Sequence, residues 1–165
     1  MMGITRLIPH LVAEYAMRRH FPARTLDAIQ HAIADGESHH DGQVCFAIEG
    51  SLRLAALLRG FTPRQRAADV FSHLRVWDTR NNSGVLIYVL LADRAIEIVA
   101  DRGIAAKISE SQWKSICIQM QTRFAAREFE RGAIDGIEAV SKLLAQHFPP
   151  VGGKANELPD RPVLL

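Results

Sequence analysis

Apolar residues recur along the chain at two different spacings, and the spacing predicts which segments are helices and which are strands. In five segments they return every three or four positions, the period of an amphipathic helix. Two prolines end the last of these segments, and a Thr-Pro-x-Gln sequence that forms a capping box opens the third. The sequence therefore predicts helices around Ile8–Tyr15, Leu26–Ile33, residues 62–74, Trp113–Phe124 and Ile137–Phe148.

Between these helical segments the period changes to two. Residues 43–48 alternate with apolar side chains on both sides, and residues 85–91 are an apolar run with no polar face. A strand without a polar face is typical of the interior of a sheet that is covered by helices on both sides. A tight turn at residues 92–94 leads into a second alternating segment, 95–100, so the two strands are expected to form a hairpin. The pattern indicates an α/β domain.

Length and composition favour one domain without stabilising cross-links. The 165 residues are 48% hydrophobic, which is enough for a sizeable core, and the two cysteines lack metal-site or redox spacing. We expect one domain over residues 1–150 and an extended tail at 151–165, where glycine and proline accumulate. The net charge of +2 is distributed among interleaved charges, so nucleic acid is not an expected partner.

Neither a targeting segment nor a membrane span is predicted. Arg6, His10 and Glu14 interrupt every apolar stretch near the N-terminus, which argues against a signal peptide. The longest apolar run, residues 84–92, is too short to cross a bilayer. We expect a cytoplasmic protein.

Polar residues gather where these strands begin and end. In an antiparallel hairpin the start of the first strand lies beside the end of the second, and a parallel strand 43–48 would begin at the same edge. This edge, which we call the rim, would collect Asp78, Asn81, Asn82, Asp101 and Arg102, together with His39, His40, Asp41 and Gln43. Carboxylate and amide oxygens suit calcium or magnesium, and Asp78, Asn82 and Asp101 are the proposed ligands.

A simpler interpretation of the rim is turn chemistry, because Asp and Asn side chains bond their own backbone in loops of every function. The adjacent His39 and His40 point to different sides of an extended chain, and we expect both to be exposed loop residues. Motifs for a phosphate-binding loop, a dinucleotide site, a nucleophile elbow and a zinc protease are absent from the sequence. The residues alone leave both interpretations open.

Two stretches carry a resemblance to a known family. They read VWDTRNNSGVLIYVLLADRAIEIVADRGI and, after a capped helix, RFAAREFERGAIDGIEAVSKLL. Together they resemble the TPM-domain family, which includes thylakoid-lumen acid-phosphatase-like proteins, photosystem-repair proteins and many bacterial members. The similarity covers residues 22–148 and is strongest at 82–103. It implies a three-layer α/β/α sandwich with a central mixed sheet that contains the 85–91/95–100 hairpin.

The resemblance also implies properties of the site. Divalent-cation binding and acid phosphatase activity are proposed for some members, and Asn82, Asp93, Asp101 and Gly103 match positions that are polar or glycine in the family. Asp93 lies at the far end of the hairpin and cannot share a site with Asn82. This chain departs from the family at Gln43, where members commonly carry glutamate, and that change weakens a hydrolase assignment. Many relatives have an export signal, a membrane anchor or a glycine-rich tail, and from this sequence we expect none of these.

Three functions follow as hypotheses. The first is a binding or assembly module that holds a cation, a small ligand or a protein partner at the rim, with Asn81, Arg102, Gly103, Asp41 and Gln43 bordering the ligands. The second is a metal-assisted phosphomonoester hydrolase in which Asp101 or Asp78 activates water. The third is a helper domain whose first helix, around Leu7, Ile8, Leu11 and Tyr15, docks on a partner.

Overall fold

The structure is a computed structural model that describes the chain from Leu7 to Leu165, with side chains described from Val12 onward except that of Glu14. The apolar side chains of Leu7, Ile8 and Leu11 in the first predicted helix lie outside the described residues. The elements are α1 (Leu7–His20), α2 (Ala23–Glu37), β1 (Gln43–Glu49), α3 (Leu54–Leu58), α4 (Pro63–His73), β2 (Gly84–Leu90), β3 (Ala95–Ala100), α5 (Arg102–Ala105), α6 (Glu110–Ala125), α7 (Phe129–His147) and β4 (Val163–Leu164).

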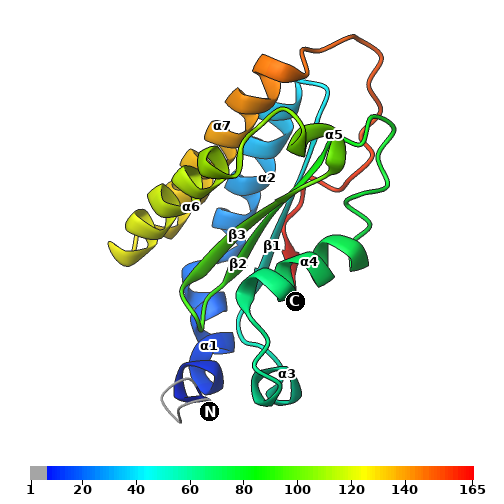
Figure 1. Cartoon of the computed structure of the whole chain (residues 1–165). Helices are drawn as coiled ribbons and strands as arrows, with labels where there is room; N and C mark the ends of the chain where they lie inside the picture. The colour runs from blue at the N-terminus through cyan, green and yellow to red at the C-terminus, as the bar shows by residue number, and fades with distance from the viewer. Residues whose placement is uncertain (1–6) are drawn as a thin grey trace.

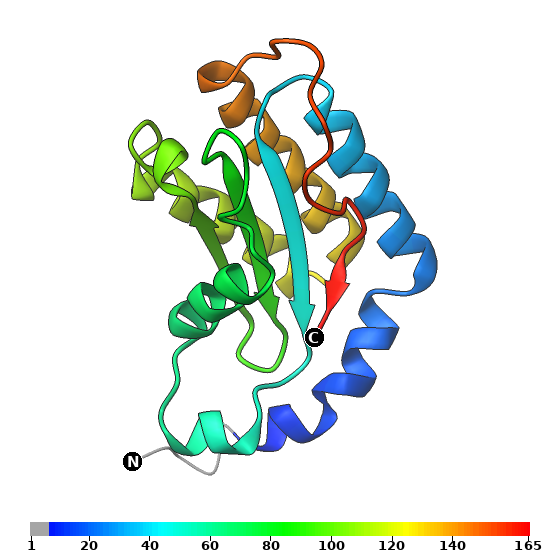
Figure 2. The ribbon, with the colours of Figure 1, turned by 90° about the vertical axis from the view of Figure 1, so that its right-hand side faces the viewer.

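The four strands form one mixed sheet in the order β3-β2-β1-β4, with helices on both faces (Figures 1 and 2). β1 runs parallel to β2, whereas β2 and β3 are an antiparallel hairpin with Val85 opposite Ala100. The α/β class and the helix-covered mixed sheet are confirmed, and so is the hairpin. The tight connection of β2 to β3 and the helical crossover from β1 to β2 follow from these strand directions.

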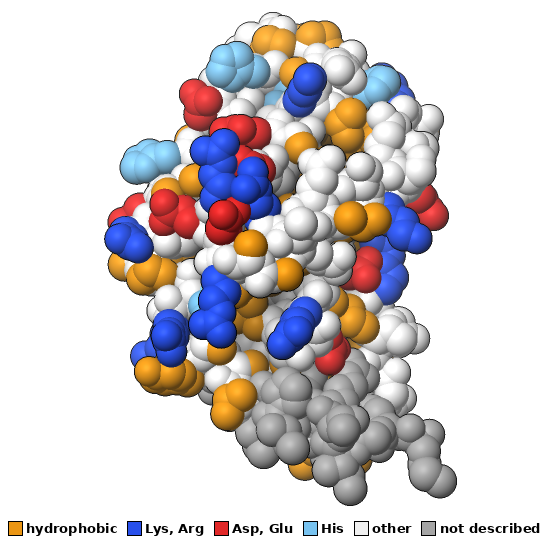
Figure 3. Space-filling view, turned by 90° about the vertical axis from the view of Figure 1, so that its left-hand side faces the viewer, with side chains coloured by type: hydrophobic (Ala, Val, Ile, Leu, Met, Phe, Trp, Pro, Cys, Tyr) orange, Lys and Arg blue, Asp and Glu red, His pale blue; other side chains and the backbone are white. Residues whose placement is uncertain are grey.

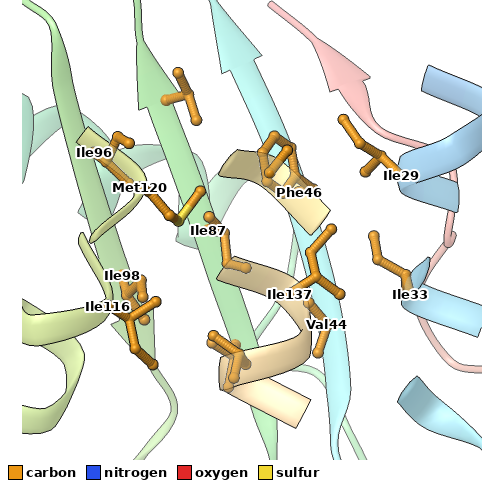
Figure 4. Close-up of a cluster of buried hydrophobic side chains, with 14 of the residues drawn as sticks. Ile29, Ile33, Val44, Phe46, Ile87, Ile96, Ile98, Ile116, Met120 and Ile137 are labelled. Atoms are coloured by element: carbon orange, nitrogen blue, oxygen red, sulfur yellow. The ribbon is translucent and has the colours of Figure 1, made fainter. Parts of the chain in front are cut away.

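Each face of the sheet packs against its own set of helices. Val44, Phe46 and Ile87 point to the face covered by α2, α6 and α7, where they meet Ile33 and Ile137 (Figure 4). On the other face, Cys45, Leu86 and Tyr88 of the same strands pack in one cluster with Ala67 and Val70 of α4. Every residue of β1 and β2 is therefore buried, which explains why neither strand carries a polar face.

The start of α4 shows how the local sequence sets an element boundary. Thr62 Oγ1 accepts a hydrogen bond from the backbone N–H of Gln65 at 3.2 Å, and Gln65 Oε1 accepts one from the backbone N–H of Thr62 at 2.9 Å. This is the capping box that the sequence predicts, with Pro63 in the first turn. α5 was not expected, because its four residues are too few to show a period.

The last residues of the chain take part in the sheet. Residues 151–165 were expected to be an extended tail, and they are largely irregular. However, Val163 and Leu164 pair in parallel with Ala47 and Ile48 of β1, and Leu158 is buried against the α4 face of the sheet. Between Leu7 and Leu165, no helix has the length and apolar character needed to cross a membrane.

Candidate functional site

The strand ends that define the rim lie together at one edge of the sheet. Gln43 at the start of β1 lies opposite Gly84 at the start of β2, and Val85 lies opposite Ala100 at the end of β3. The connections that precede β1 and β2, and the one that follows β3, therefore meet at one end of the molecule, beside α5 (Figure 1). This arrangement brings most of the polar residues selected from the sequence into one neighbourhood.

Asp101 is the most enclosed carboxylate of this group. Its side chain caps α5, because Oδ1 accepts a hydrogen bond from the backbone N–H of Arg102 at 2.7 Å. The residue is only 8% exposed, yet its second oxygen, Oδ2, is buried and has no hydrogen-bond partner among the described residues. A buried carboxylate oxygen usually has a donor or a cation beside it, so this oxygen is the strongest indication of a ligand at the rim.

Two asparagines connect the loops of the rim. Asn81 Nδ2 donates to Asp41 Oδ2 at 2.7 Å, which ties the connection before β2 to the one before β1. Asn82 adopts a positive φ of 48°, and its Oδ1 accepts from Nε and Nη2 of Arg102 at 3.2 and 3.1 Å. The Arg102 guanidinium therefore occupies the amide oxygen that was proposed as a metal ligand.

Gly103 is required by the closeness of the loop that precedes β2. A Cβ at this position would lie 2.6 Å from the backbone oxygen of Asn82 and 3.0 Å from that of Asn81. The N–H of Gly103 donates to the Asn82 oxygen at 3.1 Å. Any larger residue would push the two asparagines away from α5, so glycine keeps the rim closed.

Asp78 and Gln43 are placed differently from the other residues. The Asp78 side chain is 55% exposed and pairs with Arg75 at 3.4 Å within its own turn. Gln43 is 1% exposed, and its Oε1 accepts from the backbone N–H groups of Glu157 and Leu158 at 2.8 and 3.1 Å. Gln43 thus holds the C-terminal segment, while its Nε2 is buried without a partner among the described residues.

The expectation that both histidines are exposed is wrong for His40. His39 is exposed, whereas His40 is fully buried, and neither of its ring nitrogens makes a hydrogen bond of standard geometry in the described chain, although the Gly42 backbone interacts with the ring. Burial lowers the pKa of His40 to about 4, and the positive charge of Lys154 adds to the effect. His40 turns inward because the chain between α2 and β1 is short and packs against α7, a contact that the local sequence does not reveal.

The C-terminal segment brings two further residues to the rim that the sequence did not indicate. Lys154 Nζ donates to the Gly42 oxygen at 2.6 Å and pairs with Glu37 Oε2 at 3.2 Å. Glu157 Oε2 accepts from the backbone N–H of Arg80 at 2.7 Å. Burial raises the pKa of Glu37, although the Val44 N–H and Lys154 oppose that shift. No sequence signal links residues so far apart; only the fold brings them together.

Within the described residues, the buried side-chain polar atoms without a partner cluster near this end of the sheet. They belong to His40, Gln43, Asp101 and Ser141, and the last lies on α7. A Cβ placed at Gly36 would lie 2.3 Å from Ser141 Oγ and 3.9 Å from His40 Nε2, which locates Ser141 near His40. In the described part of the chain no three His, Cys, Asp or Glu side chains converge to hold a metal ion. A cation at the rim would therefore have fewer than three such ligands in this arrangement and would need neutral oxygens to complete its shell.

Comparisons with known proteins assign the chain to a family. The model of the TPM domain matches residues 18–143, so the chain belongs to the TPM-domain family. A similar solved structure is the NMR structure of the BA42 protein from the psychrophilic bacterium Bizionia argentinensis. It is 31% identical, with a TM-score of 0.75 over 87% of this chain and 94% of that one. A search of the curated proteins found no match.

Proposed function

We propose that this TPM domain is a binding module that holds a divalent cation, calcium or magnesium, at the rim and thereby takes part in a larger assembly. The observation that carries the proposal is the buried Oδ2 of Asp101, which has no partner among the described residues while Oδ1 caps α5. Leaving an ionised oxygen buried and unpaired costs free energy, and a bound cation removes that cost.

The residues present fit a hard cation with an incomplete protein shell. Asp101 supplies one carboxylate, and the backbone oxygens of Asn81 and Asn82 lie next to Gly103, at the start of α5. Water would complete the shell, as is common for magnesium and for weak calcium sites. Asp78 remains a proposed ligand that would have to leave its exposed pair with Arg75.

Arg102 opposes the cation in this arrangement. Its guanidinium donates to Asn82 Oδ1 and so brings a positive charge to the rim. A cation that uses Asn82 must displace Arg102, so the arginine lowers the cation affinity of the rim. Removing the Arg102 charge should therefore raise the cation affinity, whereas removing the Asp101 charge should lower it.

The test is a calorimetric titration of the full chain with calcium and with magnesium. Asp101→Asn is expected to weaken binding by roughly tenfold or more, because it removes the charged ligand. Arg102→Gln is expected to tighten binding by several-fold, about the effect of removing one nearby positive charge. Asp135→Asn, a matched control on α7 that pairs with Arg131 at 2.8 Å, should titrate like the wild type. Absence of cation binding by the wild type would refute the proposal.

The alternative function is a metal-assisted phosphomonoester hydrolase at the same rim. Its specific support is the exposed side chain of Arg102, the residue that follows Asp101, whose guanidinium lies on Asn82 Oδ1, since arginine binds phosphate oxygens in a bidentate manner. A bound cation would polarise the phosphate, and Asp101 or Asp78 would activate water. Turnover of a generic phosphate ester that requires calcium or magnesium and is lost in Asp101→Asn would favour this alternative. Cation binding without turnover would favour the binding module.

A further inference from the structure

The short helix α3 exposes apolar side chains at the end of the molecule opposite the rim. Leu54 and Leu58 are 60% and 70% exposed, and their spacing of four places them on the same side of the helix. Leu57, at 2% exposure, faces inward and anchors α3 to the core on the α4 side of the sheet. The two exposed leucines are therefore held outward on an anchored element.

The neighbouring helix α1 also exposes apolar side chains at this end of the molecule. Val12 and Tyr15 are 60% and 75% exposed and lie three residues apart, so they share one side of α1. In both ribbon views α1 and α3 lie next to each other at the end of the molecule away from α5 (Figures 1 and 2). We call Val12, Tyr15, Leu54 and Leu58, together with the arginines that flank α3, the α1–α3 surface. Exposed apolar residues that gather on one end commonly mark an interaction site.

The charged residues in the segment that carries these leucines, residues 50–61, have a single sign. Arg53 precedes α3 and Arg59 follows it; both are exposed, and residues 50–61 contain no aspartate or glutamate. In the described chain neither arginine forms an ion pair. The face of α6 and α7 is different, because Arg123 pairs there with Glu128 and Asp135 at 2.8 and 3.3 Å, and charges of both signs are mixed (Figure 3). The α3 part of the α1–α3 surface is therefore complementary to a negatively charged partner.

We propose that the α1–α3 surface docks on an anionic lipid bilayer. Leu54 and Leu58 enter the region between headgroups and acyl chains, while Arg53 and Arg59 contact lipid phosphates. Leucines that project between arginines are typical of segments that lie in the membrane interface, and basic residues add attraction to anionic lipids. Pairing of two copies through this surface would bring like charges together, which disfavours a dimer. The small apolar area makes the docking reversible.

The experiment is flotation of the full chain with phosphatidylcholine vesicles that contain or lack phosphatidylglycerol. The wild type is expected to float with the anionic vesicles and to remain unbound with pure phosphatidylcholine. Leu54→Ser/Leu58→Ser should lower the partition coefficient by roughly tenfold or more, because two apolar side chains no longer leave water. Arg53→Gln/Arg59→Gln should lower it by several-fold and reduce its dependence on salt.

Matched controls separate this surface from the rest of the molecule. Ile118→Ser removes an exposed apolar residue of α6, which is 52% exposed, and Arg24→Gln removes an exposed arginine of α2. Both variants should float like the wild type. All four variants change exposed residues, and thermal unfolding checks that they remain folded.

Three outcomes would overturn the proposal. One is a wild type that does not float with anionic vesicles, and another is flotation that the double leucine substitution leaves unchanged. The third is a wild-type dimer in light scattering that becomes monomeric in Leu54→Ser/Leu58→Ser while no vesicle binding occurs, because the surface would then join two copies. Cation titration of the leucine variant should match the wild type, since the rim lies at the other end of the molecule.

Discussion

The two ends of the central sheet each hold a buried carboxylate, and the two carboxylates differ in their hydrogen bonding. At the carboxyl end of β1, Glu49 accepts hydrogen bonds from Nε and Nη2 of Arg66 at 2.9 and 3.0 Å and from Tyr88 Oη at 2.5 Å. At the rim, Asp101 has one oxygen on a backbone N–H and the other without a partner among the described residues. Both residues are less than one tenth exposed.

This difference separates a structural role from a candidate functional one. Both oxygens of Glu49 accept hydrogen bonds from the arginine or the tyrosine hydroxyl, so Glu49, Arg66 and Tyr88 stabilise the packing of α4 on the sheet. A buried carboxylate with an open oxygen lowers stability unless something binds to it. The comparison therefore directs experiments to the rim, and four predictions test it in order of expected effect.

The largest effect is expected from acid. Because the pKa of buried His40 is about 4 in the folded chain and about 6.5 when unfolded, the unfolded chain binds more protons between these values. Stability contributed by neutral His40 is present above pH 6.5 and is lost as the pH falls toward 4, by about 3 kcal/mol. Urea unfolding across this range should show the loss, and His40→Leu should flatten it.

Glu37 acts in the opposite direction and makes the His40→Leu comparison necessary. Its pKa is raised by burial, so the folded chain holds its proton more tightly and gains stability as the pH falls through that raised value. The charges of Lys154 and His39 also lower the pKa of His40, and both residues are unchanged in the His40→Leu variant. If the wild type and His40→Leu lose equal stability on acidification, the buried histidine is not the cause.

The next largest loss of stability is expected at Glu49, the buried carboxylate whose two oxygens are both hydrogen-bonded. Glu49→Gln is expected to cost about 2 kcal/mol, because the amide offers only one acceptor oxygen to Arg66 and Tyr88. The value allows for partial screening, since the Arg66 side chain is 31% exposed. Glu97→Gln is the control on a partly exposed pair with Arg64 at 3.5 Å and should cost less than about 1 kcal/mol. Equal losses in urea unfolding would remove the contrast between the buried cluster and the surface.

Lys154→Met tests whether the C-terminal segment belongs to the rim. The substitution leaves the carboxylate of Glu37 buried without its ammonium partner, although the Val44 N–H still donates to it at 2.7 Å. We expect a loss of about 1–2 kcal/mol. The double variant Glu37→Gln/Lys154→Met should lose less than the sum of the single variants. Additive losses would mean that the two side chains act independently.

The smallest effect is expected for Asp101→Asn. The amide oxygen can still cap α5, and the change removes an unpaired buried charge, so stability without added cation should change by less than about 1 kcal/mol. The same carboxylate-to-amide change thus costs more at Glu49 than at Asp101. A loss at Asp101 as large as that at Glu49 would indicate that Oδ2 has a structural partner.

Much of the architecture could be predicted from the sequence, because local patterns encode it. The alternation in residues 43–48, the apolar run at 85–91 and the capping box at Thr62 each depend on neighbours within a few positions. The rim itself followed from strand direction, and the meeting of the β1, β2 and β3 ends bears out that geometry. The metal ligands Asp78, Asn82 and Asp101 remain a prediction that the cation titration tests.

The rest depended on contacts between distant parts of the chain. His40 is buried by the surrounding fold. Three further contacts join segments from 20 to more than 100 residues apart: Lys154 with Glu37, Gln43 with residues 157 and 158, and Arg102 with Asn82. Side-chain periodicity reports which side of an element is apolar and carries no information on which distant group will face a given atom. The sequence by itself therefore determined the elements, the hairpin and the common edge. Only the tertiary structure decided which polar atoms at that edge are paired and which are left open, because pairing is set by packing in three dimensions.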